Sequence, residues 1–212
     1  MTKKIIKLIS GVILSSFGIT CVIHANLGVF PVTAANIAIS NWFGISIGVA
    51  GMLVEFIILA SALFLGEGVS LTGIINATLG SLLIDFWNPI LPYHPLMVLG
   101  ILLLPIAWYL SSSVGLGDTN QNLLTNGILK RTNKSLGLVR GIQESLLMII
   151  GLLGHGSVTP LTIILSLFFG KLMEFEYKLL KYDPTEVNHS YLIRAKSFAR
   201  GDKNEVLEKM QE

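Results

Sequence analysis

The sequence predicts an all-α protein, a polytopic membrane bundle of six transmembrane helices. Of its 212 residues, 52% are hydrophobic and 13% are charged, whereas a soluble domain is usually about a quarter charged. Apolar runs of roughly 20 residues, the length that crosses a bilayer as a helix, recur along the chain. They are too long and too continuously apolar for the short alternating strands of a membrane barrel. The runs lie at 5–24, 45–65, 69–87, 91–111, 135–154 and 157–177.

The positions of the basic residues predict how these helices are oriented. Lys and Arg are retained on the cytoplasmic side when a membrane protein inserts. They gather before the first run, between the fourth and fifth runs, and after the sixth. The connections 25–44, 88–90 and 155–156 contain no Lys or Arg. We therefore expect a multi-pass protein of the cell (inner) membrane with both termini in the cytoplasm.

Two acidic residues in the middle of apolar runs indicate an internal repeat. Glu55 and Glu144 are 89 positions apart, and the same offset pairs Gly48 with Gly137. An ancient duplication would leave such matches on acids and glycines. Each repeat holds three spans, an odd number, so the second is expected to lie inverted relative to the first. The expected units are a first membrane repeat at 1–90, a second at 91–180 and a cytoplasmic polar tail at 181–212.

Each repeat also contains one short helical segment, at 31–44 and at 118–131. Both segments are too short to span a bilayer. Lipid would penalise their polar residues, such as Asn36 and Asn120, unless these faced protein or a water-filled cavity. The alternative is an amphipathic helix that lies at the membrane interface. The sequence is compatible with both arrangements.

Glu55 and Glu144 are the central candidates for a binding site, because an ionisable group in mid-span is costly and normally faces the bundle interior. Glu55 has no cation within one turn of its own helix. Desolvation therefore favours its protonated form, which suits proton coupling. Glu144 follows Arg140 by one turn, so that pair can neutralise itself. The candidate substrate-binding residues are Glu55, Glu144, Arg140, Gln143, Asn76, Thr33 and Asn122.

Structural roles are the alternative for these residues. Glu144 can form a simple ion pair with Arg140, and a protonated Glu55 can hydrogen-bond to a neighbouring helix. Polar side chains such as Gln143 and Asn76 commonly hydrogen-bond between membrane helices. A second group of candidates, at turns and helix ends, would gate or bound the site. These residues are Gly28, Pro31, Gly117, Asp118, Asp85 and Glu174.

The sequence lacks the motifs that mark many enzymes and nucleic-acid-binding proteins. It contains no metal-ligand spacing, phosphate-binding loop, nucleophile elbow or basic patch for nucleic acid. We therefore expect no enzymatic activity, no metal, no cofactor and no nucleic-acid partner.

Four short stretches carry a resemblance to a known family. They are Ala25-Asn26-Leu27-Gly28 through Pro31, Gly115-Leu116-Gly117, Ser135-Leu136-Gly137-Leu138-Val139-Arg140 with Glu144, and Gly154-His155-Gly156. Over about residues 5–178 the chain resembles the YczE/YyaS/YitT group of bacterial inner-membrane proteins. Acidic residues of that group are replaced here by Thr33 and Asn122. The resemblance implies a multi-pass membrane protein whose molecular activity is largely uncharacterised.

These observations favour a small-solute transporter or permease with a polar site between two inverted repeats, and with proton coupling as an option. The alternative is a membrane subunit that binds rather than pumps, such as the substrate-binding subunit of a vitamin-type importer, or an accessory protein. The expected partners are the lipid bilayer and a small solute of unknown identity. A homodimer or a further membrane partner is compatible with the sequence.

Overall fold

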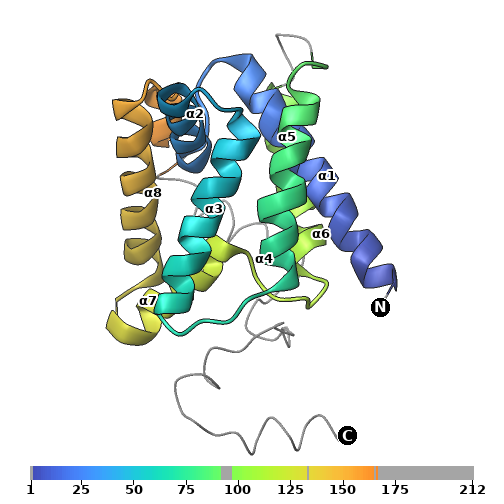
Figure 1. The fold of residues 1–212 in the computed structure, drawn as a ribbon, viewed down its shortest axis with the longest axis vertical. Helices are drawn as coiled ribbons and strands as arrows, with labels where there is room; N and C mark the ends of the chain where they lie inside the picture. Colours follow the sequence, from blue (N-terminus) through green and yellow to red (C-terminus); the bar gives the residue numbers. More distant parts are fainter. Residues whose placement is uncertain (1, 92–96, 133, 165, 167–212) are drawn as a thin grey trace, which may run out of the picture.

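The computed structural model describes residues 2–91, 97–132, 134–164 and 166. These residues form helices joined by short loops (Figure 1), and the described part of the chain contains no β-strand. Glu174 and the predicted tail at 181–212 lie outside the described residues, as does most of the predicted run 157–177. The helices are α1 (Thr2–Ala25), α2 (Pro31–Phe43), α3 (Ile47–Phe64), α4 (Leu71–Ile75), the π-helix η1 (Asn76–Gly80), α5 (Ser81–Trp87), α6 (Met97–Ser112), α7 (Asn120–Thr132) and α8 (Leu136–Leu153).

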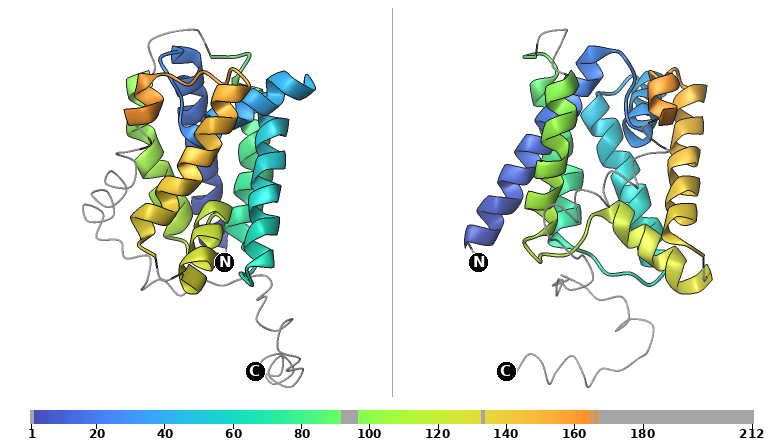
Figure 2. Two further views of the ribbon diagram at one scale, coloured as in Figure 1. Left: turned by 90° about the vertical axis from the view of Figure 1, so that its left-hand side faces the viewer. Right: turned by 180° about the vertical axis from the view of Figure 1, so that it is seen from behind.

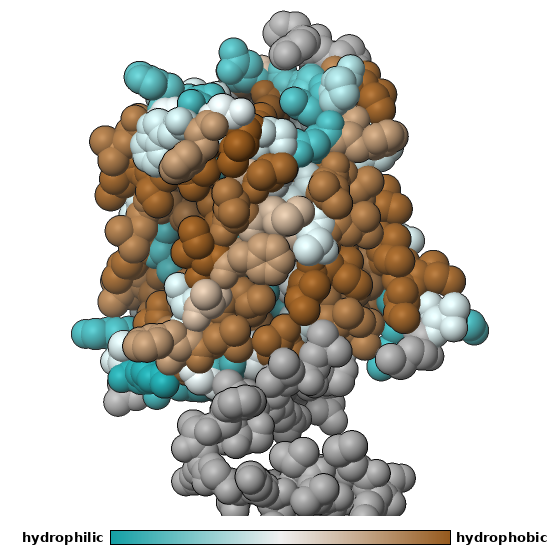
Figure 3. Space-filling view, viewed as in Figure 1, coloured by the Kyte–Doolittle hydropathy of each residue, from teal (hydrophilic) through white to brown (hydrophobic). Residues whose placement is uncertain are grey.

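Three of the described helices, α1, α3 and α8, are long and apolar enough to cross a membrane. Two further apolar stretches, 71–87 and 99–112, are shorter. Large apolar side chains such as Ile57 and Leu146 point outward and are 64% and 58% exposed. Apolar surface covers the flanks of the bundle, and hydrophilic residues gather at its two ends (Figure 3). The prediction of a helical membrane protein is therefore confirmed.

Serine caps set the beginnings of α3 and α8. The side-chain oxygen of Ser46 accepts a hydrogen bond from the Val49 amide at 3.2 Å, and that of Ser135 accepts one from the Leu138 amide at 3.4 Å. Each cap satisfies an amide that the first helical turn leaves without a backbone partner. The paired helices α3 and α8 begin and end 89 positions apart, and α2 and α7 do the same.

The short helices α2 and α7 lie at opposite ends of the bundle (Figures 1 and 2). Helix α2 packs against α8 and α3, and α7 packs against α3 and α8. Helix α1 packs along α6, where Gly18 and Gly100 let the two backbones approach. A Cβ atom on Gly100 would lie 2.6 Å from the carbonyl oxygen of Gly18. Small residues at such crossings allow the close packing that holds membrane helices together.

The predicted regular helix at 69–87 is interrupted by the π-helix η1. Within this element the side-chain amide of Asn76 donates a hydrogen bond to the Thr72 carbonyl at 2.9 Å. A side chain that enters the backbone hydrogen-bond ladder is a recognised cause of an irregular helix. The sequence pattern missed this wider turn because its hydropathy is the same as that of an ordinary helix.

Candidate functional site

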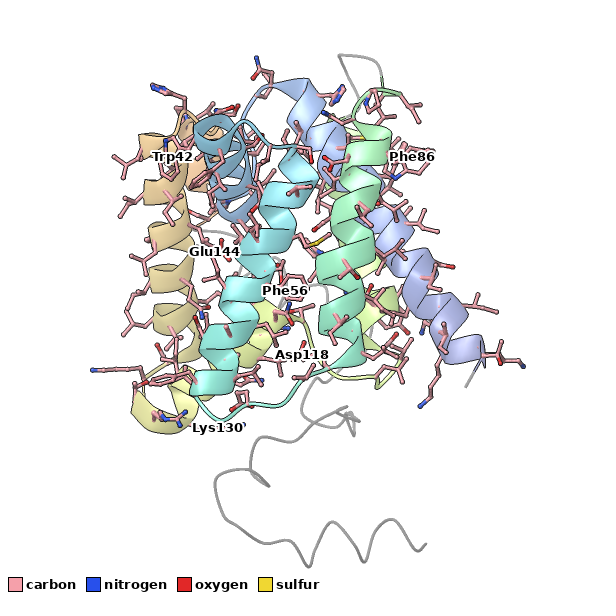
Figure 4. All side chains as sticks on the ribbon, viewed as in Figure 1. Trp42, Phe56, Phe86, Asp118, Lys130 and Glu144 are labelled. Carbon is pink, nitrogen blue, oxygen red and sulfur yellow. The ribbon has the colours of Figure 1, made fainter. Side chains whose placement is uncertain are left out.

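A partly enclosed cavity of about 180 Å³ lies inside the bundle, between residues of both halves of the chain. Glu144 of α8 stands beside it at mid-height, between Trp42 at one end of the molecule and Lys130 at the other (Figure 4). Six of the seven candidate substrate-binding residues line the cavity. They are Thr33, Glu55, Asn76, Asn122, Arg140 and Glu144.

Glu144 forms an ion pair with Arg140, one turn earlier on α8. The Nε atom of Arg140 lies 3.2 Å from Oε1 of Glu144, and the side chain of Glu144 is only 8% exposed. Helix α7 supplies further partners for the guanidinium. The Nη2 atom of Arg140 donates a hydrogen bond to the Gln121 side-chain oxygen at 2.7 Å, and the Nη1 atom of Arg140 donates one to the Asn122 side-chain oxygen at 3.4 Å. Bonds from several directions fix the position of this half-buried cation.

Glu55 is held by a neutral group. Its Oε2 atom accepts a hydrogen bond from the Asn120 side-chain amide at 3.0 Å, across the contact between α3 and α7. In the part of the chain that the structure describes, Glu55 has no ion-pair partner. The guanidinium of Arg140, which pairs with Glu144, also lines the cavity into which Glu55 is placed. In the described lining, two acids therefore accompany one cation.

Asp118, a candidate gating residue, lies behind the cavity wall and supports Asn122. Its Oδ1 atom accepts from the Asn122 side-chain amide at 2.7 Å and from the Thr119 backbone amide at 2.8 Å. Asn122 in turn accepts from Arg140. Asp118 therefore orients a residue of the cavity without lining the cavity itself.

Gln143 is the candidate that the structure separates from the cavity. Its side-chain oxygen accepts from the Thr125 hydroxyl at 2.7 Å, which is the bond between helices that the sequence analysis named as the alternative. One residue along a helix turns a side chain by about 100°, so Gln143 and Glu144 face different neighbours.

Asp85 caps helix α3 and does not line the cavity. Its carboxylate accepts from the Ser46 hydroxyl at 2.5 Å and from the Gly48 amide at 2.7 Å. A carboxylate at a helix N-terminus satisfies free amides and complements the helix dipole. This geometry agrees with a boundary role.

The remaining gating candidates are turn residues. Gly28 and Gly117 have φ angles of 126° and 94°, which glycine adopts without strain. A Cβ atom on either would lie 2.2 Å from a side-chain atom, of Thr159 for Gly28 and of Ser70 for Gly117. Pro31 is the buried first residue of α2, the helical position that proline tolerates best. These residues shape the ends of α2 and α7 outside the cavity wall.

Sequence reasoning missed several residues of the cavity. Asn36 and Ser111 line it, with only 8% and 2% of their surfaces exposed. The side-chain oxygens of both are buried, and no described residue forms a hydrogen bond with them. Phe30 and Trp108 form an apolar part of the wall. Isolated serines and aromatic residues are common in membrane helices, so only the fold distinguishes these from their neighbours.

A family model described as a family of unknown function (DUF6198) matches residues 2–178. No curated protein and no solved structure matches the chain. The family match spans every described helix and assigns no activity to the cavity.

Proposed function

We propose that this chain, which belongs to the DUF6198 family of unknown function, is a small-solute transporter or permease of the cell membrane. The observation that carries the proposal is that Glu55, Glu144 and Arg140 line one cavity inside an apolar bundle. Charged groups at mid-depth in a membrane protein are costly, and they commonly mark solute and ion pathways. Proton coupling is part of the proposal, because a carboxyl group without a full countercharge can carry the proton.

The proposed architecture is two inverted repeats of three spans each, at 1–90 and 91–180, with both termini cytoplasmic. The opposite positions of α2 and α7 support it (Figure 1). The crossing of α1 and α6 supports it too. A Cβ atom on Gly11 would lie 2.8 Å from the Ala107 carbonyl oxygen, and one on Gly100 would lie 2.6 Å from that of Gly18. The two contacts correspond to each other under the 89-residue offset. Position 11 corresponds to position 100, and position 18 corresponds to position 107.

Cysteine labelling tests this topology. Cys21 is the single cysteine of the chain, so a Cys21→Ala background is free of thiols. In that background, Phe43→Cys places a thiol at the end of α2, and Lys134→Cys places one between α7 and α8. Both positions are exposed. A membrane-impermeant maleimide added to intact cells should label Phe43→Cys, and Lys134→Cys only after permeabilisation. Labelling of both from outside would contradict the inverted arrangement.

The narrower assignment to the YczE/YyaS/YitT group is part of the same proposal. It is supported by the stretches quoted above, which include Gly28, Gly117 and the Arg140–Glu144 pair. That pair faces the cavity, and the two glycines form the turns that lead into α2 and α7.

The size of the cavity favours a small solute over a vitamin. Pockets for drug-sized ligands usually enclose roughly 300–1,000 Å³, whereas this cavity holds about 180 Å³. The alternative function, a subunit that binds rather than pumps, therefore fits a vitamin-type ligand less well than it fits a small one.

Proteoliposomes containing only the purified chain test the function. The probes are labelled glycine, ethylammonium, acetate and urea, together with an entrapped pH-sensitive dye. We expect the chain to accelerate entry of at least one probe over empty liposomes, and Glu55→Gln to abolish this entry. Glu67→Gln is the matched control, because Glu67 pairs with Lys130 at 2.6 Å and does not line the cavity. A probe that binds the chain without crossing the membrane would overturn transport in favour of the subunit.

A further inference from the structure

We infer that the cavity is selective for a small organic ammonium ion, with Glu55, Asn36 and Ser111 as its polar partners. The inference rests on the proposed function, because it names the class of solute that the same cavity takes. It follows from the balance of charge in the cavity, from its unpartnered oxygens and from its aromatic wall.

Among the residues that the structure describes, the charged side chains that line the cavity are two carboxylates and one guanidinium, those of Glu55, Glu144 and Arg140. Arg140 is bonded directly to Glu144. Glu55 receives a hydrogen bond only from the neutral amide of Asn120 among its described partners. With both acids ionised, the described lining of the cavity carries one surplus negative charge. In an apolar surrounding such a charge is strongly disfavoured until a proton or another cation neutralises it.

Two further oxygens in the wall lack a donor. The Asn36 side-chain oxygen and the Ser111 hydroxyl oxygen are buried and have no hydrogen-bond partner among the described residues, and both residues line the cavity. A buried oxygen without a donor is unfavourable, and each such atom in a native protein calls for an explanation. An ammonium group has three donors and no acceptor. The Glu55 carboxylate and the two neutral oxygens of Asn36 and Ser111 supply three acceptors, one for each of these three donors.

Aromatic rings form another part of the wall. Phe30 and Trp108 line the cavity, and their ring centroids lie 6.2 Å apart with the planes at 72°. The faces of aromatic rings attract cations, most strongly in the case of tryptophan. An alkylammonium ion can place its alkyl part against these rings and its charge toward Glu55.

The bonds of Arg140 make an anionic or zwitterionic solute less suitable. The guanidinium forms an ion pair with the Glu144 carboxylate. It also donates hydrogen bonds to the side-chain oxygens of Gln121 and Asn122. A carboxylate on the solute would have to displace one of them and would also meet the two glutamates. Like charges at short range repel each other far more strongly inside a protein than in water, because the interior screens them less.

Calorimetric titration of the purified full-length chain in detergent micelles tests the inference. The probes are ethylammonium chloride, the similarly sized sodium acetate, the zwitterion glycine, and sodium chloride as the salt control. We expect ethylammonium to bind at least tenfold more tightly than the other three. Preferential binding of acetate, glycine or sodium would overturn the inference.

Variants connect the binding to the named residues. Glu55→Gln should weaken ethylammonium binding by roughly ten- to hundredfold, since it replaces a charged hydrogen bond by a neutral one. Ser111→Ala, a milder change, should weaken it by roughly two- to tenfold. Glu67→Gln, outside the cavity, should leave it unchanged. Each variant is first shown to be monodisperse, and equal affinity for Glu55→Gln, Ser111→Ala and the parent chain would contradict the assignment.

The two proposals fail separately. Ethylammonium that binds in micelles but does not enter proteoliposomes leaves the cation site standing and overturns transport. Entry of acetate or glycine in place of ethylammonium leaves transport standing and overturns the cation site.

Discussion

Glu55 and Glu144 occupy equivalent places in the two halves of the molecule, and their surroundings differ. Both lie within long apolar helices, and both line the same cavity. Glu144 pairs with the Arg140 guanidinium at 3.2 Å, whereas Glu55 accepts from the neutral Asn120 amide at 3.0 Å. The position that corresponds to Arg140 in the first half is Gly51. Of these two corresponding positions, 51 and 140, the second therefore carries a cation and the first does not.

Packing explains why the first half carries no such cation. A Cβ atom on Gly51 would lie 2.9 Å from the Asn36 side-chain nitrogen and 3.5 Å from the Ser81 hydroxyl oxygen. A larger residue there would have to displace the Asn36 side chain. The comparison teaches that similar helices can hold acids at corresponding sequence positions while, among the described residues, Glu144 has an ion-pair partner and Glu55 has none. On the proposals above, Glu144 organises the wall and Glu55 is left for the solute or proton.

The largest expected effect is that of Arg140→Met. Glu144 would remain buried without its cation, and removing one partner of a buried ion pair typically costs about 3–5 kcal/mol. The measurement is the free energy of unfolding in mixed detergent micelles. Lys134→Met is the control for loss of a positive charge, because Lys134 is exposed. Equal stability of the two variants would show that the ion pair contributes nothing to the fold.

Gly48→Ala should destabilise the protein by about 1–3 kcal/mol, as overpacking usually does. The added Cβ atom would lie 2.1 Å from the Ser81 carbonyl oxygen and 2.6 Å from the Asp85 carboxylate. The measurement is again unfolding in micelles.

Gly137→Ala extends this comparison to the other half. No described atom lies within 4 Å of a Cβ atom on Gly137, and alanine in an open helix position gains up to about 1 kcal/mol over glycine. If the second repeat reproduces the first, a sixth helix crowds this position and Gly137→Ala destabilises like Gly48→Ala. We expect destabilisation, and a stabilised variant would contradict the repeat.

The two Glu→Gln variants should differ in stability. Glu144→Gln removes the countercharge of Arg140, but Arg140 keeps its hydrogen bonds to Gln121 and Asn122. We therefore expect a loss of about 1–2 kcal/mol in the free energy of unfolding. Glu55→Gln keeps an oxygen that accepts from Asn120 and removes a carboxylate without an ion-pair partner among the described residues, so we expect no loss of stability. Thermal unfolding of both variants in the same detergent measures the difference. The reverse order of stabilities would mean that Glu55, not Glu144, is the structural acid.

The smallest expected difference is between the two serine caps. Loss of an N-cap hydroxyl usually costs about 0.5–2 kcal/mol. Ser46→Ala should lie in the upper part of this range, because Ser46 also donates to Asp85. Ser135→Ala should lie at the lower end, since the bond that Ser135 accepts from the Leu138 amide is 3.4 Å long. Equal costs, measured by thermal unfolding in micelles, would mean that the Asp85 contact adds nothing.

Hydropathy located the long helices well. The predicted run 45–65 became α3 at Ile47–Phe64, and the run 135–154 became α8 at Leu136–Leu153. The inward orientation of Glu55 and Glu144 could be predicted as well, because a carboxylate in the middle of an apolar run has few favourable positions except the bundle interior. The individual contacts could not be read. Asn36 and Ser111 reach the cavity and Gln143 does not, although nothing in their residue types separates them.

From residue order alone came the membrane setting, the places of the long helices and the corresponding positions of Glu55 and Glu144 within them. These are properties of short stretches, since apolarity over about 20 residues and a charge within it are both local. Packing between distant segments settled the rest: that Arg140 pairs with Glu144 while Asn120 holds Glu55, and that a cavity of about 180 Å³ remains between them. A cavity is the space left where helices far apart in the chain fail to fill the interior, so its size and lining exist only once all of them are in place.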